Sequence, residues 1–248
     1  MKTTNNTVLI TGGSAGIGLE IAKAFSEQGN HVIITGRDEE RLRHAAAQLK
    51  NATSIVHDVT SEQDTDALIG RIEKDFPHLN ILVNNAGKAY AYQLNKMAQS
   101  AAKARQEMET NLHAVIDLTE KLLPVLLRQQ EAAIINVSSI VAFVPAHGIA
   151  TYSASKAALH SYTQSLRYVL NQSSSVKVFE LMPPLVNTEF SKDIGGASGI
   201  PPAQVAMELL RALRNDTYEI RVGTTEDIYQ LYRSDPDGAF QAINGALA

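Results

Sequence analysis

The chain alternates between short apolar runs and longer segments in which apolar residues recur every three or four positions. The first pattern is typical of buried strands, and the second is typical of amphipathic helices. The runs that predict strands cover positions 7–11, 31–35, 53–57, 80–83, 132–137, 176–181 and 218–222. They are almost continuously apolar, as expected for parallel strands whose two faces are both covered by helices.

Strands that alternate with helices favour an α/β fold with a parallel sheet. A chain of 248 residues with 44% hydrophobic and 19% charged residues can bury one large core, so we expect a single domain over residues 1–248. Longer helical patterns include positions 39–50, where Asp38 is the expected N-cap, and positions 103–129.

The composition narrows the classes of partner. The 22 basic and 26 acidic residues give a net charge of −4, which argues against nucleic acid and against an anionic membrane surface. The absence of cysteine excludes disulfides and thiolate catalysis. Without a signal-like apolar start or a run long enough to span a membrane, the sequence predicts a cytoplasmic protein that acts on a small molecule.

A glycine-rich turn joins the first predicted strand to a helix. Gly12 allows a tight turn, Gly16 lets the backbone approach a pyrophosphate, and Gly18 permits close packing of the helix on the strand. The free N–H groups of the helix would face the phosphates, with Ser14 and Ile17 as further contacts. A ligand-free turn is the alternative.

The second predicted strand ends at Gly36, where an NAD site usually carries a carboxylate, and Arg37 follows it. A guanidinium at this place suits the 2′-phosphate of NADP, so NADP is favoured over NAD; a solvated loop charge is the alternative. After the third strand, Asp58 and Val59 stand at a strand's carboxyl end, where ligands of open parallel sheets collect; a turn capped by Asp58 is the alternative, and His57 is expected to be structural.

Polar residues recur at the ends of the next strands. Asn85, Ala86 and Gly87 follow the fourth strand. The amide can bind neighbouring backbone, and the small residue and glycine leave room for a cofactor ribose. Asn111 interrupts the apolar face of the helix at 103–129, where asparagine is a poor helix former. A capped turn and a packing asparagine are the respective alternatives.

The fifth strand leads to Ser138 and Ser139, thirteen residues before Tyr152. Tyr152 and Lys156 are four positions apart, so a helix would place both side chains on one face. A nearby ammonium favours the phenolate and would lower the pKa of Tyr152. Two turn serines and an ordinary helix pair are the alternatives for these residues taken alone.

Together, these motifs occur in the order and at the intervals found in short-chain dehydrogenases/reductases, and the chain resembles the shorter-subunit branch of that family over residues 7–188. The resemblance implies a Rossmann-type doubly wound sheet of seven parallel strands in the order 3-2-1-4-5-6-7, with helices on both faces. It also implies a homodimer or homotetramer. Ala15 stands where many NADP-preferring relatives carry a second basic residue, so Arg37 is the one evident cation.

The resemblance further implies an NAD(P)-dependent oxidoreductase, with NADPH-linked reduction of a carbonyl or the reverse oxidation of a secondary alcohol. Tyr152 would be the general acid or base, and Ser139 would donate to the substrate oxygen. Lys156 would bind the nicotinamide ribose, and Asn111 would hold a water that connects Lys156 to solvent. Neither a metal nor a covalent intermediate is required.

The region after the sixth strand departs from the family pattern. Pro183 is followed by Pro184 where the family usually has glycine, which stiffens the loop. Val186 and Thr188 are retained, and with Pro183 they are expected to contact the cofactor. The Pro-Pro pair loosely resembles a subgroup of bacterial oxidoreductases named after the operon for lipoteichoic acid D-alanylation.

Two segments near the end have their own expected roles. Residues 187–203 are rich in glycine and predict a small lid over the substrate, or else a surface loop. Residues 225–248 form a tail that we expect to pack on its own subunit or on a partner's. His147 is expected to line the substrate site. A dinucleotide sensor without catalysis on the same fold is the rival function.

Overall fold

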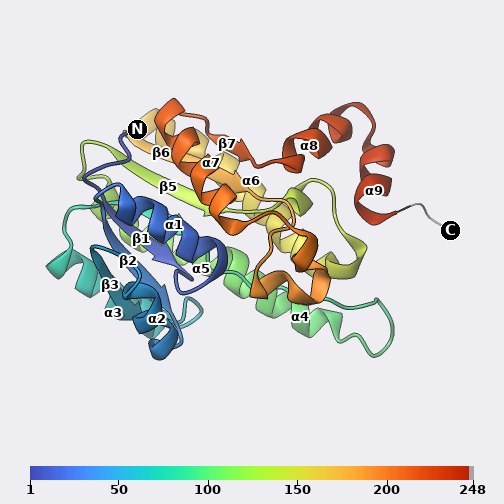
Figure 1. Cartoon of the computed structure of the whole chain (residues 1–248), viewed down its shortest axis with the longest axis horizontal. Helices are drawn as coiled ribbons and strands as arrows, with labels where there is room; N and C mark the ends of the chain where they lie inside the picture. Colours follow the sequence, from blue (N-terminus) through green and yellow to red (C-terminus); the bar gives the residue numbers. More distant parts are fainter. Residues whose placement is uncertain (246–248) are drawn as a thin grey trace.

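The central sheet of the computed structural model, which describes residues 1–245, has seven parallel strands in the order β3-β2-β1-β4-β5-β6-β7 (Figure 1). The expected fold class and strand order are therefore confirmed. The strands are β1 (Thr7–Thr11), β2 (His31–Gly36), β3 (Ala52–Val56), β4 (Leu79–Asn84), β5 (Ala132–Val137), β6 (Val176–Met182) and β7 (Glu219–Arg221).

Two hydrophobic cores lie on opposite faces of the sheet because successive strand residues point to opposite sides. In β1, Val8 and Ile10 belong to one core and Leu9 to the other, and all three are fully buried. The first core is closed by α1 (Gly16–Glu27), α2 (Glu39–Ala46) and α7 (Pro202–Asn215), and the second by α3 (Glu62–Asp75), α5 (Ala114–Leu126) and α6 (Ala150–Ser173). Burial on both faces accounts for the continuous apolar runs in the sequence.

Two of the expected helices have different bounds. The helix expected at 39–50 begins after Asp38, whose carboxylate accepts from Arg41 N at 2.9 Å as predicted, but it ends at Ala46. It ends there because tight turn bonds, from Gln48 N to Ala45 O and from Leu49 N to Ala46 O, redirect the chain. The helix expected at 103–129 is instead α4 (Ser100–Met108), a π-helical turn (Glu109–His113) and α5.

The remaining elements lie at the end of the sheet that carries the strands' carboxyl ends. α4 packs against α6, and α8 (Thr224–Ser234) and α9 (Pro236–Asn244) follow β7 and extend beyond the sheet (Figure 1). Among residues 1–245, none of the helices combines the length and the apolar character needed to cross a membrane. Strand order reverses between β1 and β4, and open α/β sheets bind ligands in the crevice at such a point.

The tightest backbone approach in this crevice is at Gly18, in the first turn of α1. A Cβ at this position would meet Gly12 O and Asn85 Nδ2, each at 2.4 Å. We expect Gly18→Ala to lower the melting temperature, because backbone atoms cannot yield as a flexible side chain does.

Gly70→Ala is the matched control. Gly70 is an exposed residue of α3 with no atom within 4 Å of its Cβ position, so alanine is expected to stabilise the protein by about 0.5–1 kcal/mol. Thermal unfolding of the two variants measures the difference, and a Gly18→Ala variant as stable as the native chain would contradict the close packing.

Candidate functional site

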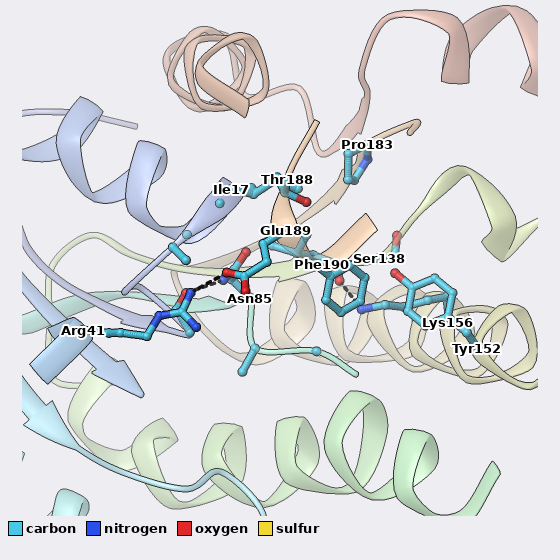
Figure 2. A pocket seen from close by; sticks show the side chains of 17 residues that line it. Ile17, Arg41, Asn85, Ser138, Tyr152, Lys156, Pro183, Thr188, Glu189 and Phe190 are labelled. Atoms are coloured by element: carbon cyan, nitrogen blue, oxygen red, sulfur yellow. Dashed lines mark hydrogen bonds and ion pairs between the residues drawn. The ribbon is translucent and has the colours of Figure 1, made fainter. Parts of the chain in front are cut away.

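A long cleft follows the carboxyl ends of the central strands. It consists of two cavities, of about 350 and 600 Å³, that share Gly12, Arg41, Ala86 and Gly87. The smaller cavity leads to Tyr152 and Lys156 (Figure 2). The larger one lies at the carboxyl ends of β2 and β3. Of the residues expected to bind a cofactor, the cleft contains Gly12, Ser14, Gly16, Ile17, Gly18, Arg37, Asp58, Val59, Asn85, Ala86, Gly87, Tyr152, Lys156, Pro183 and Thr188.

The glycine turn is held in place by Asn85. Its Nδ2 donates to Thr11 O at 2.9 Å and to Gly12 O at 3.2 Å, and its backbone N–H donates to Thr11 Oγ1. Gly12 and Gly16 have φ angles of +65° and +54°, which glycine adopts without strain. Because Ala15, the N-cap of α1, offers no side-chain cap, the first N–H groups of this helix suit an anion.

The larger cavity contains both residues expected after the third strand. Asp58 Oδ1 accepts from Thr60 N at 3.0 Å and from Thr60 Oγ1 at 2.8 Å. Partial burial would raise the pKa of Asp58, but these hydrogen bonds and the charge of Arg37 outweigh it and lower that pKa. Asp58 thus forms a turn and also lines the cavity. His57 is buried between Thr35 and Thr65, the structural place expected for it.

An ion pair that the sequence did not predict crosses the cleft. Arg41, in the first turn of α2, donates to Glu189 at 2.9 Å, although the two residues are 148 positions apart (Figure 2). Both side chains are at least half exposed, so their pairing contributes little to stability. Arg41 lines both cavities and thereby adds a second guanidinium to the one expected at Arg37.

Tyr152 and Lys156 lie one turn apart on α6 and are both buried, with exposures of 8% and 4%. The Lys156 ammonium is 5.6 Å from the centre of the Tyr152 ring and donates to Val137 O, at the end of β5, at 2.8 Å. Phe190 packs against the Tyr152 ring from the opposite side of the cavity, with 6.0 Å between ring centres (Figure 2).

The pKa of Tyr152 differs from the sequence expectation. Burial raises it well above its usual range, a hydrogen bond with Ser139 lowers it in part, and the charge of Glu107 raises it further. Desolvation therefore outweighs the lowering that we expected from Lys156. Burial also lowers the pKa of Lys156 to about 8, against an opposing effect of the Glu180 carboxylate. The phenol is thus protonated at neutral pH.

The two serines after β5 point to different partners. The Ser139 hydroxyl contacts the Tyr152 phenol and lowers its pKa in part, and Ser139 Oγ also accepts from Val141 N at 3.3 Å. Ser138 Oγ donates instead to the buried Glu180 at 2.5 Å. Ser138, and not Ser139, is among the residues that line the smaller cavity, and the contact expected between Ser139 and a substrate oxygen stays a prediction.

Asn111 lies in the π-helical turn and is fully buried. Its side chain accepts from Lys88 N and donates to Lys88 O and to Ser155 Oγ, each at 2.8 Å. Asn111 Oδ1 and Lys156 Nζ lie 3.4 and 3.9 Å from the Cβ position of Gly87, so a larger side chain there would crowd both groups. The asparagine amide is therefore occupied by protein partners, and a water held by Asn111 stays a prediction.

The segment after β6 contributes one wall of the cavity. Pro183 and Thr188 line it, whereas the Val186 side chain is buried in the core and is absent from both cavities. Residues Glu189–Ile194 and Gly196–Ser198 form short 3-10 helices, and the first of them carries Phe190. A lid function for this segment stays a prediction.

The C-terminal helices contact the region around Tyr152. Ile228 of α8 and Ile243 of α9 pack against the apolar cluster that contains Tyr152. Asn244 Oδ1 accepts from His147 N at 2.8 Å, so His147 contacts α9. His147 lines neither of the two cavities, and its expected place beside a substrate stays a prediction. The tail thus packs on its own chain through residue 244, and residues 246–248 lie outside the described structure.

The fold and the cleft define a doubly wound α/β protein in which a buried tyrosine and lysine of α6 lie beside the end of β5. Residues 6–198 match the family model described as short chain dehydrogenase. The chain is 41% identical over 249 residues to the uncharacterized oxidoreductase DltE of Bacillus subtilis (strain 168), with 98% of each chain covered. The protein therefore belongs to the short-chain dehydrogenase family of oxidoreductases.

Two further relatives extend the comparison. Serine 3-dehydrogenase of Agrobacterium fabrum is 36% identical over 189 residues, which are 75% of this chain and 74% of the relative. The crystal structure of a short-chain dehydrogenase from Burkholderia cenocepacia J2315 in complex with NADP is similar over 100% of both chains, with a TM-score of 0.87 and 26% identity.

We expect Asn111→Ala to lower the free energy of unfolding by about 1–3 kcal/mol, because it removes the partners of Lys88 and Ser155 next to a buried site. Asn95→Ala is the matched control, since Asn95 is exposed and its side chain accepts from Met97 N within a loop. Its effect should stay within about 0.5 kcal/mol. Urea unfolding measures both, and equal losses would contradict a special role for Asn111.

Proposed function

We propose that this protein is an NAD(P)-dependent oxidoreductase that reduces a carbonyl to a secondary alcohol, with NADPH as the preferred cofactor. The observation that carries this proposal is the burial of Tyr152 and Lys156 together at the end of the cleft. The Burkholderia cenocepacia relative in complex with NADP supports a nicotinamide dinucleotide as the cofactor.

Tyr152 is suited to act as the general acid. Its phenol is protonated at neutral pH, and it lies where the cavity meets an apolar cluster that includes Val141 and Ile149. A carbonyl oxygen that receives a hydride on its carbon gains negative charge and needs a proton. Tyr152 can donate that proton, and the Ser139 hydroxyl beside it can donate a hydrogen bond to the same oxygen.

Lys156 assists this proton transfer. Its ammonium is fixed by Val137 O and lies on the same helical face as Tyr152, so its positive charge favours the phenolate that forms when the proton leaves. In the same position it can donate to a ribose hydroxyl. Lys156 therefore favours both the chemical step and the placement of the cofactor.

The cleft fits a dinucleotide by its shape. Gly12 and Gly16 keep the turn before α1 open, since a Cβ at Gly16 would lie 3.2 Å from Thr188 Cγ2 and narrow the cleft. The N-terminus of α1 would bind the pyrophosphate, and Asp58 and Val59 would lie at the adenine end. When bound, the nicotinamide supplies the hydride.

The preference for NADPH follows from two guanidinium groups. Arg37 and Arg41 both line the larger cavity, next to Gly36, where an NAD site usually has a carboxylate. A 2′-phosphate carries negative charge that arginine binds strongly. Arg41 would exchange its exposed contact with Glu189 for the phosphate at little cost.

A dinucleotide sensor without catalysis is the second candidate. It would need the glycine turn and Asn85 but not a buried tyrosine and lysine at the end of the cleft. Burying Lys156 disfavours its charge. A protein that only bound the nucleotide could use the lysine for a ribose contact, but it would gain nothing from the buried phenol beside it. NADPH consumption over a panel of ketones and aldehydes separates the two functions.

Tyr152→Phe tests the general acid. It keeps the ring and its contact with Phe190 but removes the proton, so we expect kcat to fall by about 10²–10⁴-fold with cofactor affinity retained. Tyr168→Phe, at an exposed position of the same helix, is the control and should keep full activity. Full carbonyl reduction by Tyr152→Phe would rule out the mechanism.

Arg37→Asp tests the cofactor preference. It removes a cation and adds a charge that repels the 2′-phosphate, so the ratio of kcat/KM for NADPH to that for NADH should fall about 10–100-fold. Arg43→Asp makes the same change of charge on α2 at an exposed residue outside both cavities, and should leave the ratio unchanged. The same ratio in all three proteins would refute the assignment of Arg37.

A further inference from the structure

A carboxylate lies in the middle of the apolar strand β6. Glu180 is fully buried, between the buried residues Phe179 and Leu181. An ionised side chain at such a place is costly unless other groups compensate its charge. Glu180 contributes to none of the proposed cofactor contacts, so its place near the site needs another explanation.

Three contacts hold Glu180. Its Oε1 accepts from Ser138 Oγ at 2.5 Å, and its Oε2 lies 2.8 Å from His160 Nδ1, which is also 3.0 Å from Oε1. His160 is four residues after Lys156 on α6, so both side chains lie on the face of the helix that meets β5 and β6. Glu180 therefore joins the end of β5 to the helix that carries the proposed catalytic pair.

The same carboxylate acts on Lys156. The Lys156 ammonium donates to the carbonyl of Val137, a neutral group, while the negative charge of Glu180 raises the lysine pKa against the larger lowering by burial. Without this charge, the neutral amine would be favoured more strongly. A neutral amine cannot support the departure of the proton from Tyr152 as a cation does.

We propose that Glu180 is a positioning residue that keeps Lys156 cationic and fixes the strand end from which Ser138 and Ser139 project. Its consequence for catalysis rests on the proposed function, whereas its effect on the charge of Lys156 does not. The charge of the Glu180 carboxylate opposes the effect of burial and extends, toward higher pH, the range in which the Tyr152 and Lys156 pair holds both of its protons.

Other charged groups surround this cluster. His160 is half-buried, and its pKa is raised first by the hydrogen bond to Glu180, with burial opposing. Arg167 lowers and Glu219 raises the pKa of His160, and the two pair with each other at 3.5 Å. On the opposite side, the charge of Glu107 acts on Tyr152. The negative charge of Glu180 thus raises the pKa of both His160 and Lys156. If His160 lost its positive charge, the Glu180 charge would be less compensated and would favour the Lys156 cation more strongly.

The charge of Lys156 determines in which direction the activity should change with pH. Lys156 is cationic below its pKa of about 8 and neutral above it. Removal of the Glu180 charge should lower the midpoint of the Lys156 titration by about one pH unit. The alkaline fall of kcat/KM for carbonyl reduction should then move to lower pH by the same amount, which is about a tenfold shift in proton concentration.

The test uses the full chain without substrate or cofactor. Lysine labelled with ¹³C at Cε is titrated by NMR, and the Lys156 signal is assigned by its loss in Lys156→Arg. Glu180→Gln keeps the shape of the side chain and an acceptor for Ser138, and we expect its Lys156 midpoint about one unit below that of the native protein. Thermal unfolding of the same sample reports whether the fold is kept.

Two controls isolate the charge of Glu180. Glu189→Gln removes one negative charge from an exposed residue of the same cavity, and should leave the Lys156 midpoint unchanged. His160→Gln disturbs the buried cluster but keeps the carboxylate, and its midpoint should stay at or above the native value. An unchanged midpoint in Glu180→Gln, or an equal fall in His160→Gln, would overturn the proposal.

The activity measurement separates this inference from the proposed function. If the Lys156 midpoint moves in Glu180→Gln and the pH profile of kcat/KM moves with it, both proposals are supported. If the midpoint moves but no carbonyl reduction is found with the native protein, the electrostatic role of Glu180 stands and the proposed function fails. A lower melting temperature with a native midpoint would reduce Glu180 to a structural residue.

Discussion

The hydrogen bond from the buried Lys156 ammonium to the carbonyl of Val137 is the contact on which the site depends. It ties α6 to the end of β5, and because every strand of the sheet is parallel, this end lies beside the turn that follows β4, the strand between β5 and β1. Asn85 makes the corresponding link between β4 and the glycine turn. The geometry of the cleft thus follows from a few bonds between strand ends.

Much of this arrangement could be predicted from the sequence. The strands were recognisable because helices cover both faces of the sheet, which leaves few polar residues in runs such as 132–137. The order of the strands came from the family resemblance, since periodicity alone does not specify neighbours. The helix ends were less predictable, because turn bonds after Ala46 and the side-chain bonds of Asn111 depend on where the chain goes next.

The features that sequence reasoning missed depend on tertiary contacts or on burial. The contact of Arg41 with Glu189 joins residues on different elements, and nothing in the local pattern indicates it. The pKa of Tyr152 depends on how completely the phenol is removed from water, which spacing along a helix does not reveal. Glu180 did leave a signal, a charged residue inside an apolar strand, and such an interruption is a reason to look for buried partners.

The apolar surroundings of Tyr152 come from two separate parts of the chain. Val141 and Ile149 lie within the region that matches the family model, whereas Ile228 and Ile243 belong to α8 and α9, beyond residue 198. Substitutions in these two helices can therefore reshape the space next to the phenol without altering the glycine turn or the lysine. Such a division would let evolution change the apolar surroundings of the phenol, through α8 and α9, while the glycine turn, the tyrosine and the lysine stay the same.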